Sequence, residues 1–210
     1  MSRDTKTAPG GASYGRPGGN LLGTAGEHDI PSGRWSIDAE RSSVAFSMKH
    51  MLLATLNGRF DEFDGVLEVG ADGARAAGTV KAGSIDTNEP VRDDHLRSSP
   101  DFFDVERHPE ISFTSTRISS RESGHLQIVG ALTMRGITRE MELDGRLSAL
   151  DGQPSGSTHE THDAARVQIA LHGELNRKDF GLTWNSALET GGVLVGEDVT
   201  INLEVQFIKS

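Results

Sequence analysis

The stretch from Arg92 to Asp104 holds the densest collection of side chains that could do chemistry, because arginine, aspartate, histidine and phenylalanine follow one another closely there. Arg92, His95 and Arg97 could bind the phosphate or carboxylate headgroup of a ligand, since a guanidinium fork matches the geometry of those anions. A purely structural role is the alternative, in which Asp93 and Arg97 form an i,i+4 ion pair on a solvated helix. The residues alone leave both interpretations open.

Eight histidines raise the question of a metal site, but their spacing does not match one. His159 and His162 are close together, yet they stand in a polar segment with no apolar shell to fix them. No HExxH motif occurs, and the chain has no cysteine, which excludes thiolate ligands, thiol nucleophiles and disulfides. We therefore expect no metal ion and no cofactor.

Signatures of catalysis are missing as well. The sequence has no GxSxG elbow and no phosphate-binding P-loop. A catalytic group inside an apolar pore would be a titratable side chain whose pKa is shifted by burial, and His50 and Asp179 are the candidates. We expect the protein not to be an enzyme; an isomerase or cyclase acting on a lipid is the catalytic alternative.

The charge and hydropathy of the chain restrict its partners and its place in the cell. A net charge of −10 disfavours nucleic acid and anionic membrane surfaces, which are themselves negative. The longest apolar run, around Met51–Leu56, is far too short to span a membrane. No apolar segment of a signal peptide follows Met1, so we expect a cytoplasmic protein.

Two segments of different composition divide the chain. Residues 1–30 are rich in glycine and proline and carry few large apolar side chains, so they cannot bury enough surface to offset the entropy of ordering. We expect a disordered tail over residues 1–30 and one domain over residues 31–210. That domain is long enough for a hydrophobic core of its own.

From Arg34 onward the dominant hydrophobic period is two, which is typical of strands with one buried and one solvated face. Short polar or glycine-bearing segments at 70–73, 120–124 and 135–138 suit hairpins, so neighbouring strands should be antiparallel. About eight such strands would close into a barrel that side chains fill or that holds one small ligand. The clearest runs are Val44/Phe46/Met48, Ile111/Phe113, Leu126/Ile128/Leu132/Met134, Val167/Ile169/Leu171 and Val199/Ile201/Leu203/Val205/Phe207.

The segment from residue 86 to residue 107 interrupts this pattern, and we predict a short helical insert around residues 88–105. Asn88 can cap a helix that has Pro90 in its first turn. Phe102 and Phe103 would then anchor the insert across an end or a side of the sheet.

Gly130, Gly145 and Gly173 occupy positions in the inward-facing phase of their strands. One interpretation is that they let the strands bend sharply. The other is that they leave space for a guest molecule, and the sequence does not decide between the two.

From about Arg34 to Lys209, the order and spacing of short motifs resemble those of the YceI-like proteins, a lipocalin-like family described as polyisoprenoid-binding. Each motif is weak by itself, but their succession is specific. The motifs are Trp35-Ser-Ile-Asp38, Ser42-Ser-Val-Ala-Phe46, His50, Gly58-Arg-Phe60, Phe63-Asp-Gly65, Ser84-Ile-Asp-Thr87, Arg92-Asp-Asp-His-Leu96, Asp101-Phe-Phe-Asp104, Pro109-Glu-Ile-Ser-Phe113, Gly130-Ala-Leu-Thr-Met-Arg-Gly136 and Arg177-Lys-Asp-Phe-Gly-Leu182.

The resemblance implies an all-β fold, namely an eight-stranded antiparallel lipocalin-like barrel with a long apolar pore. It implies a bound polyisoprenoid, isoprenoid quinone or fatty-acid derivative, and no catalytic centre. Many members of the family are exported, whereas this chain shows no signal peptide. The Arg-Asp-x-His-Leu motif could close the mouth of the pore over the headgroup. By strand phase, the expected lining residues are Phe46, Met48, Phe60, Phe113, Leu132, Met134, Ile169 and Trp184.

We therefore expect non-catalytic binding and carriage of a long apolar or amphiphilic ligand inside the barrel. Beside the lipid-modifying enzyme, a second alternative is an interaction scaffold whose barrel is plugged by its own side chains. The sequence also allows a homodimer.

Overall fold

The computed structural model describes residues 30–50, 54–121, 124–150, 165–185 and 195–210 of the chain. The predicted tail over residues 1–29 lies outside the described residues, as does the segment with His159 and His162. Ile30 is described, and its side chain is buried against the core. Within the described ranges, no helix is long and apolar enough to cross a membrane.

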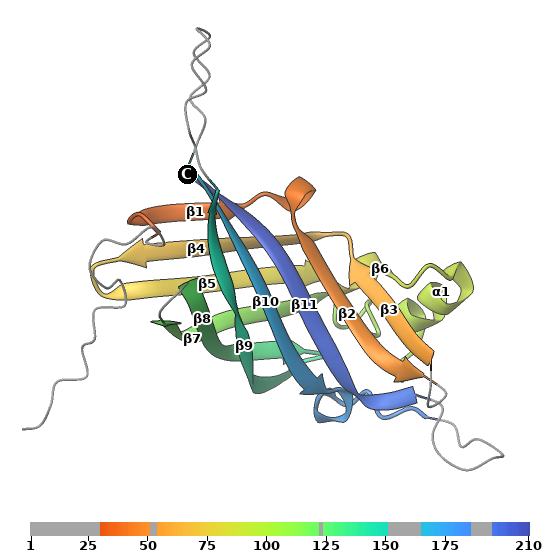
Figure 1. Ribbon diagram of the computed structural model, residues 1–210. Helices are drawn as coiled ribbons and strands as arrows, with labels where there is room; N and C mark the ends of the chain where they lie inside the picture. The colour runs from red at the N-terminus through yellow and green to blue at the C-terminus, as the bar shows by residue number, and fades with distance from the viewer. Residues whose placement is uncertain (1–29, 51–53, 122–123, 151–164, 186–194) are drawn as a thin grey trace, which may run out of the picture.

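Strands dominate the described residues, and a single α-helix lies among them (Figure 1). The helix is α1 (Pro90–Ser98), and short 3-10 turns are η1 (Ala39–Arg41), η2 (Ala82–Ser84) and η4 (Arg177–Phe180). The strands are β1 (Gly33–Ile37), β2 (Ser43–His50), β3 (Ala54–Phe60), β4 (Phe63–Gly70), β5 (Gly73–Lys81), β6 (Ile85–Asp86), β7 (Glu110–Arg121), β8 (His125–Met134), β9 (Ile137–Leu150), β10 (Arg166–Asn176) and β11 (Val195–Lys209).

Six of these strands are halves of three longer, bent strands. β1 and β2 pair one after the other with β11, so that Ile37 lies opposite Phe207 and Ser43 lies opposite Glu204. The second bent strand consists of β3 and β4, of which β4 pairs with β1 and β3 pairs with β2. The third consists of β5 and β6, of which β5 pairs with β4 and β6 pairs with β3. Each pair of halves therefore follows one path along the barrel wall.

All of these pairings are antiparallel, and the pairing of β1 with β11 closes the sheet. The closed ring runs β1-β4-β5-β7-β8-β9-β10-β11, which confirms the predicted eight-stranded antiparallel barrel. Closure removes the free edge that an open sheet would expose along this ring. The predicted hairpins are also confirmed, because they join β4 to β5, β7 to β8 and β8 to β9.

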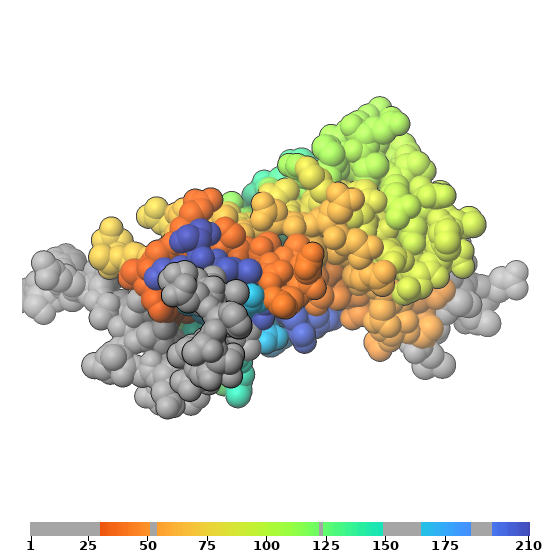
Figure 2. Space-filling model, turned by 90° about the horizontal axis from the view of Figure 1, so that it is seen from above, coloured from red at the N-terminus to blue at the C-terminus, as the bar shows by residue number. Residues whose placement is uncertain are grey.

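The predicted helical insert connects β6 to β7 at one end of the barrel (Figure 1). Seen from above, the yellow-green insert is massed at that end of the molecule (Figure 2). Pro90 stands in the first turn of α1, as expected. The predicted cap is wrong: the residue before the helix is Glu89, and Asn88 takes a left-handed backbone conformation with φ 61°.

The ion pair between Asp93 and Arg97, which the structural alternative supposed, is not formed: Arg97 pairs with Asp94. Asp93 is buried, and its carboxylate accepts hydrogen bonds from the backbone N–H (3.0 Å) and the hydroxyl group of Thr87. Buried carboxylates need such donors, because an unpaired buried charge is costly. Asp93 therefore fixes the start of the insert instead of decorating a solvated face.

The inward-phase glycines permit close packing and do not leave space for a guest. A Cβ atom on Gly145 would lie 1.9 Å from the carbonyl oxygen of Ala170. A Cβ atom on Gly130 would lie 2.4 Å from the ring of Phe113. Neighbouring backbone and side chains thus occupy the room that these residues free, which favours the strand-bending interpretation.

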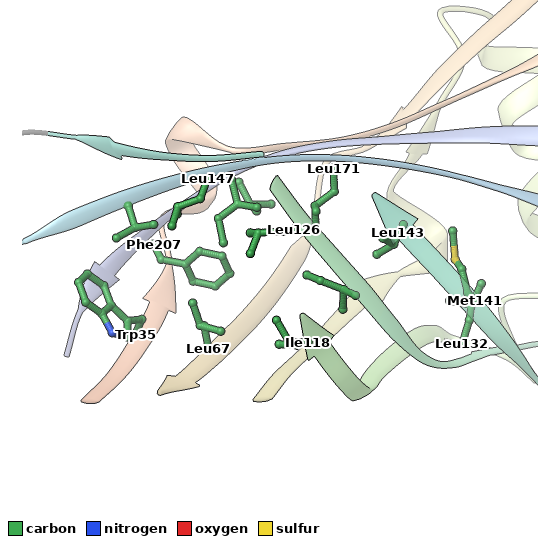
Figure 3. Close-up of a cluster of buried hydrophobic side chains, with 14 of the residues drawn as sticks. Trp35, Leu67, Ile118, Leu126, Leu132, Met141, Leu143, Leu147, Leu171 and Phe207 are labelled. Carbon is green, nitrogen blue, oxygen red and sulfur yellow. The ribbon is translucent and has the colours of Figure 1, made fainter. Parts of the chain in front are cut away.

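The interior of the barrel is filled unevenly along its length. At one end, Trp35 is fully buried and donates from Nε1 to the Pro31 carbonyl oxygen at 3.0 Å, and leucine, isoleucine and valine side chains pack around it (Figure 3). We call this the packed end. The opposite end, beneath α1, carries a smaller cluster around Phe46 and Phe60, and we call it the open end. The residues of the packed end are Ile30, Trp35, Val69, Ile118, Leu126, Leu147 and Val167.

Candidate ligand-binding cavity

An apolar cavity of about 460 Å³ lies inside the barrel. Small-molecule pockets commonly measure about 300–1,000 Å³, so this cavity has the size of a ligand site. All eight strands of the closed ring contribute to its wall, together with β2, β3, β6 and the helical insert. Leu67 and Phe207 belong to the wall but Trp35 does not, so the packed end forms the floor of the cavity.

The residues that strand phase predicted for the lining all lie at the cavity wall. Phe46 and Phe60 meet there with ring centroids 5.6 Å apart, and Phe60 meets Phe103 of the insert at 5.9 Å. Aromatic and methionine side chains provide a wall that adapts to a flexible guest. The predicted residues in the wall are Phe46, Met48, Phe60, Phe113, Leu132, Met134, Ile169 and Trp184.

Three rings at the open end mark where the cavity meets solvent. Trp184 lines the cavity although its residue is 37% exposed, and it packs on Phe102 with centroids 5.4 Å apart. His95 is also exposed and lines the cavity, and it meets Phe102 at 5.2 Å. We call this rim of Trp184, Phe102 and His95 the mouth.

The three residues predicted to bind a headgroup separate in the structure. Arg92 and His95 line the cavity, whereas Arg97 does not. The guanidinium of Arg92 is partly buried and donates to the hydroxyl oxygen of Thr87 at 2.7 Å and to its carbonyl oxygen at 2.8 Å. Arg92 thus combines a place at the cavity wall with a structural bond to the start of the insert.

Arg97 has a structural role. Its guanidinium donates to the carbonyl oxygens of Gly83 at 2.8 Å and Ile85 at 2.6 Å, and it pairs with Asp94 at 3.1 Å. These bonds tie α1 to η2 and β6. The helix is thereby held over the open end, which keeps His95 at the mouth.

Sequence reasoning assigned no role to Arg177, although it is the most deeply buried charged group at the cavity wall. Only 4% of the residue is exposed, and it follows Gly173 and Leu175 in the inward phase of β10. That phase is the signal that could have identified it. Burial lowers the pKa of Arg177, and the negative charge of Glu197 partly opposes this shift.

The guanidinium of Arg177 is held by backbone carbonyl groups. Its Nε donates to Gly196 at 2.8 Å, and one terminal nitrogen donates to Val195 at 3.4 Å. The other terminal nitrogen donates to the carbonyl oxygen of Leu182. Leu182 and Val195 themselves line the cavity, so these bonds place the guanidinium at its wall.

The two residues that could have served catalysis are not brought together at the cavity. His50 ends β2 and lines the cavity, where it is half-buried. Asp179 is exposed on η4 and does not line it. Among the described residues, no group of three or more histidine, aspartate or glutamate side chains could hold a metal ion.

A closed antiparallel barrel around an apolar cavity, with a helical cover at one end, is the architecture of a lipocalin-like binding protein. Residues 35–207 match the family model of the YceI-like domain, and the chain belongs to that family. UPF0312 proteins of Staphylococcus aureus are 31–32% identical to it over 176 residues, which is 82% of this chain and 96% of theirs. The family resemblance found in the sequence is thus confirmed.

Solved structures share the fold. BcnA of Burkholderia cenocepacia aligns with a TM-score of 0.67 and 18% identity over 81% of this chain and 98% of its own. A polyisoprenoid binding domain from Saccharophagus degradans aligns with a TM-score of 0.63 and 14% identity over 84% of this chain and 98% of its own. A mutant YceI protein of Campylobacter jejuni, crystallised with a monobromobimane guest, aligns with a TM-score of 0.63 and 22% identity over 77% of this chain and 90% of its own.

Proposed function

We propose that the protein binds the hydrocarbon tail of an amphiphilic lipid inside the barrel and does not transform it. The observation that carries this proposal is the cavity, whose wall is almost entirely apolar and which the residues of the mouth line at the open end. Water needs polar partners to occupy a cavity, so an apolar guest suits this one better. Burial of a tail contributes up to about 0.8 kcal/mol per methylene group.

Polyisoprenoids, isoprenoid quinones and fatty-acid derivatives all carry a tail of this kind. The fold that the chain shares with the Saccharophagus degradans polyisoprenoid binding domain favours the first of these. The floor at Leu67 and Phe207 limits how far a tail can enter. Tail length is therefore a property that the barrel would select.

The cavity also bears on the two alternative functions, an interaction scaffold and a lipid-modifying enzyme. A scaffold with a plugged barrel would have its interior filled by side chains, and the cavity shows that this interior is not. A lipid-modifying enzyme would need reactive groups that converge on the tail. Of the two candidates for such a group, His50 lines the cavity and Asp179 does not.

Two neighbouring positions on β11 provide a direct test. Ile201 lines the cavity, and the next residue, Asn202, is exposed on the outside of the barrel. Ile201→Trp should fill the cavity and weaken binding of a polyprenol or a long-chain fatty acid about tenfold or more, since displacing two methylene groups already has that effect. Asn202→Trp should bind as the wild type does. Equal affinities for both variants, measured by fluorescence titration, would refute a tail inside the barrel.

A further inference from the structure

Arg177 stands at the cavity wall and forms no ion pair with any residue that the structure describes. Its acceptors are the carbonyl oxygens of Gly196, Leu182 and Val195, which are neutral. A guanidinium has five N–H donors, so two remain beyond these three bonds among the described residues. Glu197, the acid whose negative charge acts on Arg177, forms its ion pair with Lys178.

Several other arginines of the described chain, unlike Arg177, form ion pairs with carboxylates. Arg34 and Arg59, for example, pair with carboxylates on the exposed surface, where water screens the charges. Arg177 is almost wholly buried and has no carboxylate within ion-pair distance in the described part of the chain. A buried charge without a counter-ion is costly, so an anion that reached it would be stabilised.

The other ionisable side chains of the described wall are basic or exposed. Arg92, His95 and His50 are basic, and the one acidic residue in the described wall is Asp64, which is exposed on β4. The chain as a whole carries a net charge of −10, so this basic lining contrasts with the rest of the molecule. An anionic group beside an apolar tail fits such a cavity, because guanidinium donors pair well with carboxylate and phosphate.

We propose that Arg177 binds the anionic headgroup of the ligand, so that the cavity selects acidic amphiphiles, with a carboxylate or a phosphate, over neutral lipids of the same tail. The inference rests on the proposed function and narrows the class of its ligand. The two remaining N–H groups of Arg177 would pair with the headgroup, and the tail would extend toward the floor at Leu67.

Ligand pairs that share a tail and differ in headgroup charge test this proposal. Palmitate is compared with hexadecanol, and farnesyl phosphate with farnesol, by titration calorimetry on the wild-type protein. We expect the acid of at least one pair to bind about ten- to a hundredfold more tightly than its alcohol, as charge-assisted hydrogen bonds allow. The pair with the larger ratio identifies the headgroup as carboxylate or phosphate. Equal binding within both pairs would overturn the headgroup proposal alone, whereas absence of binding by all four ligands would overturn the proposed function.

Variants assign the preference to a residue. Arg177→Gln should reduce the ratio of acid to alcohol affinity to near one. Arg146→Gln removes the same charge from an exposed position at the outer surface and should keep the wild-type ratio. If Arg92→Gln abolishes the ratio and Arg177→Gln does not, the assignment to Arg177 is wrong.

A measurement on the wild type covers the case in which Arg177→Gln fails to fold. The side-chain Nε–H resonance of Arg177 should shift when the preferred acid is added and stay in place when the matching alcohol is added. Equal responses to acid and alcohol, or no response to the acid, would overturn the proposal.

Discussion

The packed end and the open end of the barrel are built from the same strands, yet their interiors differ. At the packed end, Trp35 fills the centre, and Lys209 lies over its ring with the ammonium nitrogen 5.7 Å from the centroid. At the open end, Phe46 and Phe60 line a cavity and leave its centre free. The halves β2, β3 and β6 of the three bent strands lie at the open end, together with the helical insert (Figure 1).

The comparison shows how a small barrel separates stability from binding. A densely packed interior gains contacts from every side chain, so removing one group there leaves an unfilled hole. A side chain at the wall of an existing cavity already lacks neighbours on one side and has fewer contacts to lose. Changes at the packed end should therefore act mainly on stability, and changes at the open end mainly on ligand binding.

The largest expected loss of stability comes from truncating a side chain at the packed end. Trp35→Ala should lower the free energy of unfolding by about 3–5 kcal/mol, as truncation of a buried aromatic residue does. Met48→Ala, at the cavity wall, should cost clearly less and should weaken ligand binding more. Urea unfolding and ligand titration of both variants measure the contrast. Similar losses of stability at both positions would contradict the division of the barrel.

A substitution at the floor of the cavity should affect both stability and ligand binding. Leu67→Ala should cost about 2–5 kcal/mol of stability and extend the cavity toward Trp35. The ligand preference of this variant should shift toward longer tails, which a series of fatty acids of increasing chain length would measure. Val69→Ala is the control, because Val69 is buried at the packed end and does not line the cavity. A shift caused by Val69→Ala and not by Leu67→Ala would place the floor elsewhere.

A smaller effect concerns the insert that covers the open end. Asp93→Ala should cost about 1–3 kcal/mol, because the Thr87 donors lose a buried acceptor. Asp94→Ala, whose side chain is 80% exposed, should stay within about 0.5 kcal/mol of the wild type. Hydrogen exchange should show faster opening of α1 in the first variant alone. Equal protection of α1 in both variants would mean that Asp93 does not anchor the insert.

The smallest expected effect comes from removing a surface ion pair beside the open end. A hydrogen bond from Lys178 lowers the pKa of Glu197 in the folded protein. A lowered folded pKa stabilises the fold above the ordinary glutamate pKa, near pH 4.3, and this stabilisation is lost as the pH falls through the folded value. Glu197→Gln should therefore lower the melting temperature slightly at neutral pH and leave it unchanged in strong acid. A difference that persists in acid would have another cause.

The sequence predicted the barrel and the cavity wall better than the details of the polar groups. A period of two identifies which face of a strand points inward, and it placed residues such as Phe46 and Ile169 at the wall. It does not indicate how far along the barrel axis a residue lies, so the division into a packed and an open end could not be foreseen. The bends that make β1 and β2 one strand depend on pairing with β11.

Polar roles depended on neighbours that are distant in the sequence. Arg97 binds carbonyl groups of η2 and β6, and Asp93 binds Thr87 instead of Arg97. Helical spacing alone gives no sign of these partners. Arg177 continues the inward phase of β10, so its place was accessible to pattern reasoning, but its carbonyl partners on β11 were not.

Native mass spectrometry of the protein after incubation with a lipid extract tests the central claim most directly. The account predicts one lipid per chain in the wild type and in Asn202→Trp, and loss of that lipid in Ile201→Trp. Extraction of the bound mass should yield a long-chain amphiphile. A wild-type mass without lipid, or a bound lipid that Ile201→Trp retains, would contradict a ligand inside the barrel.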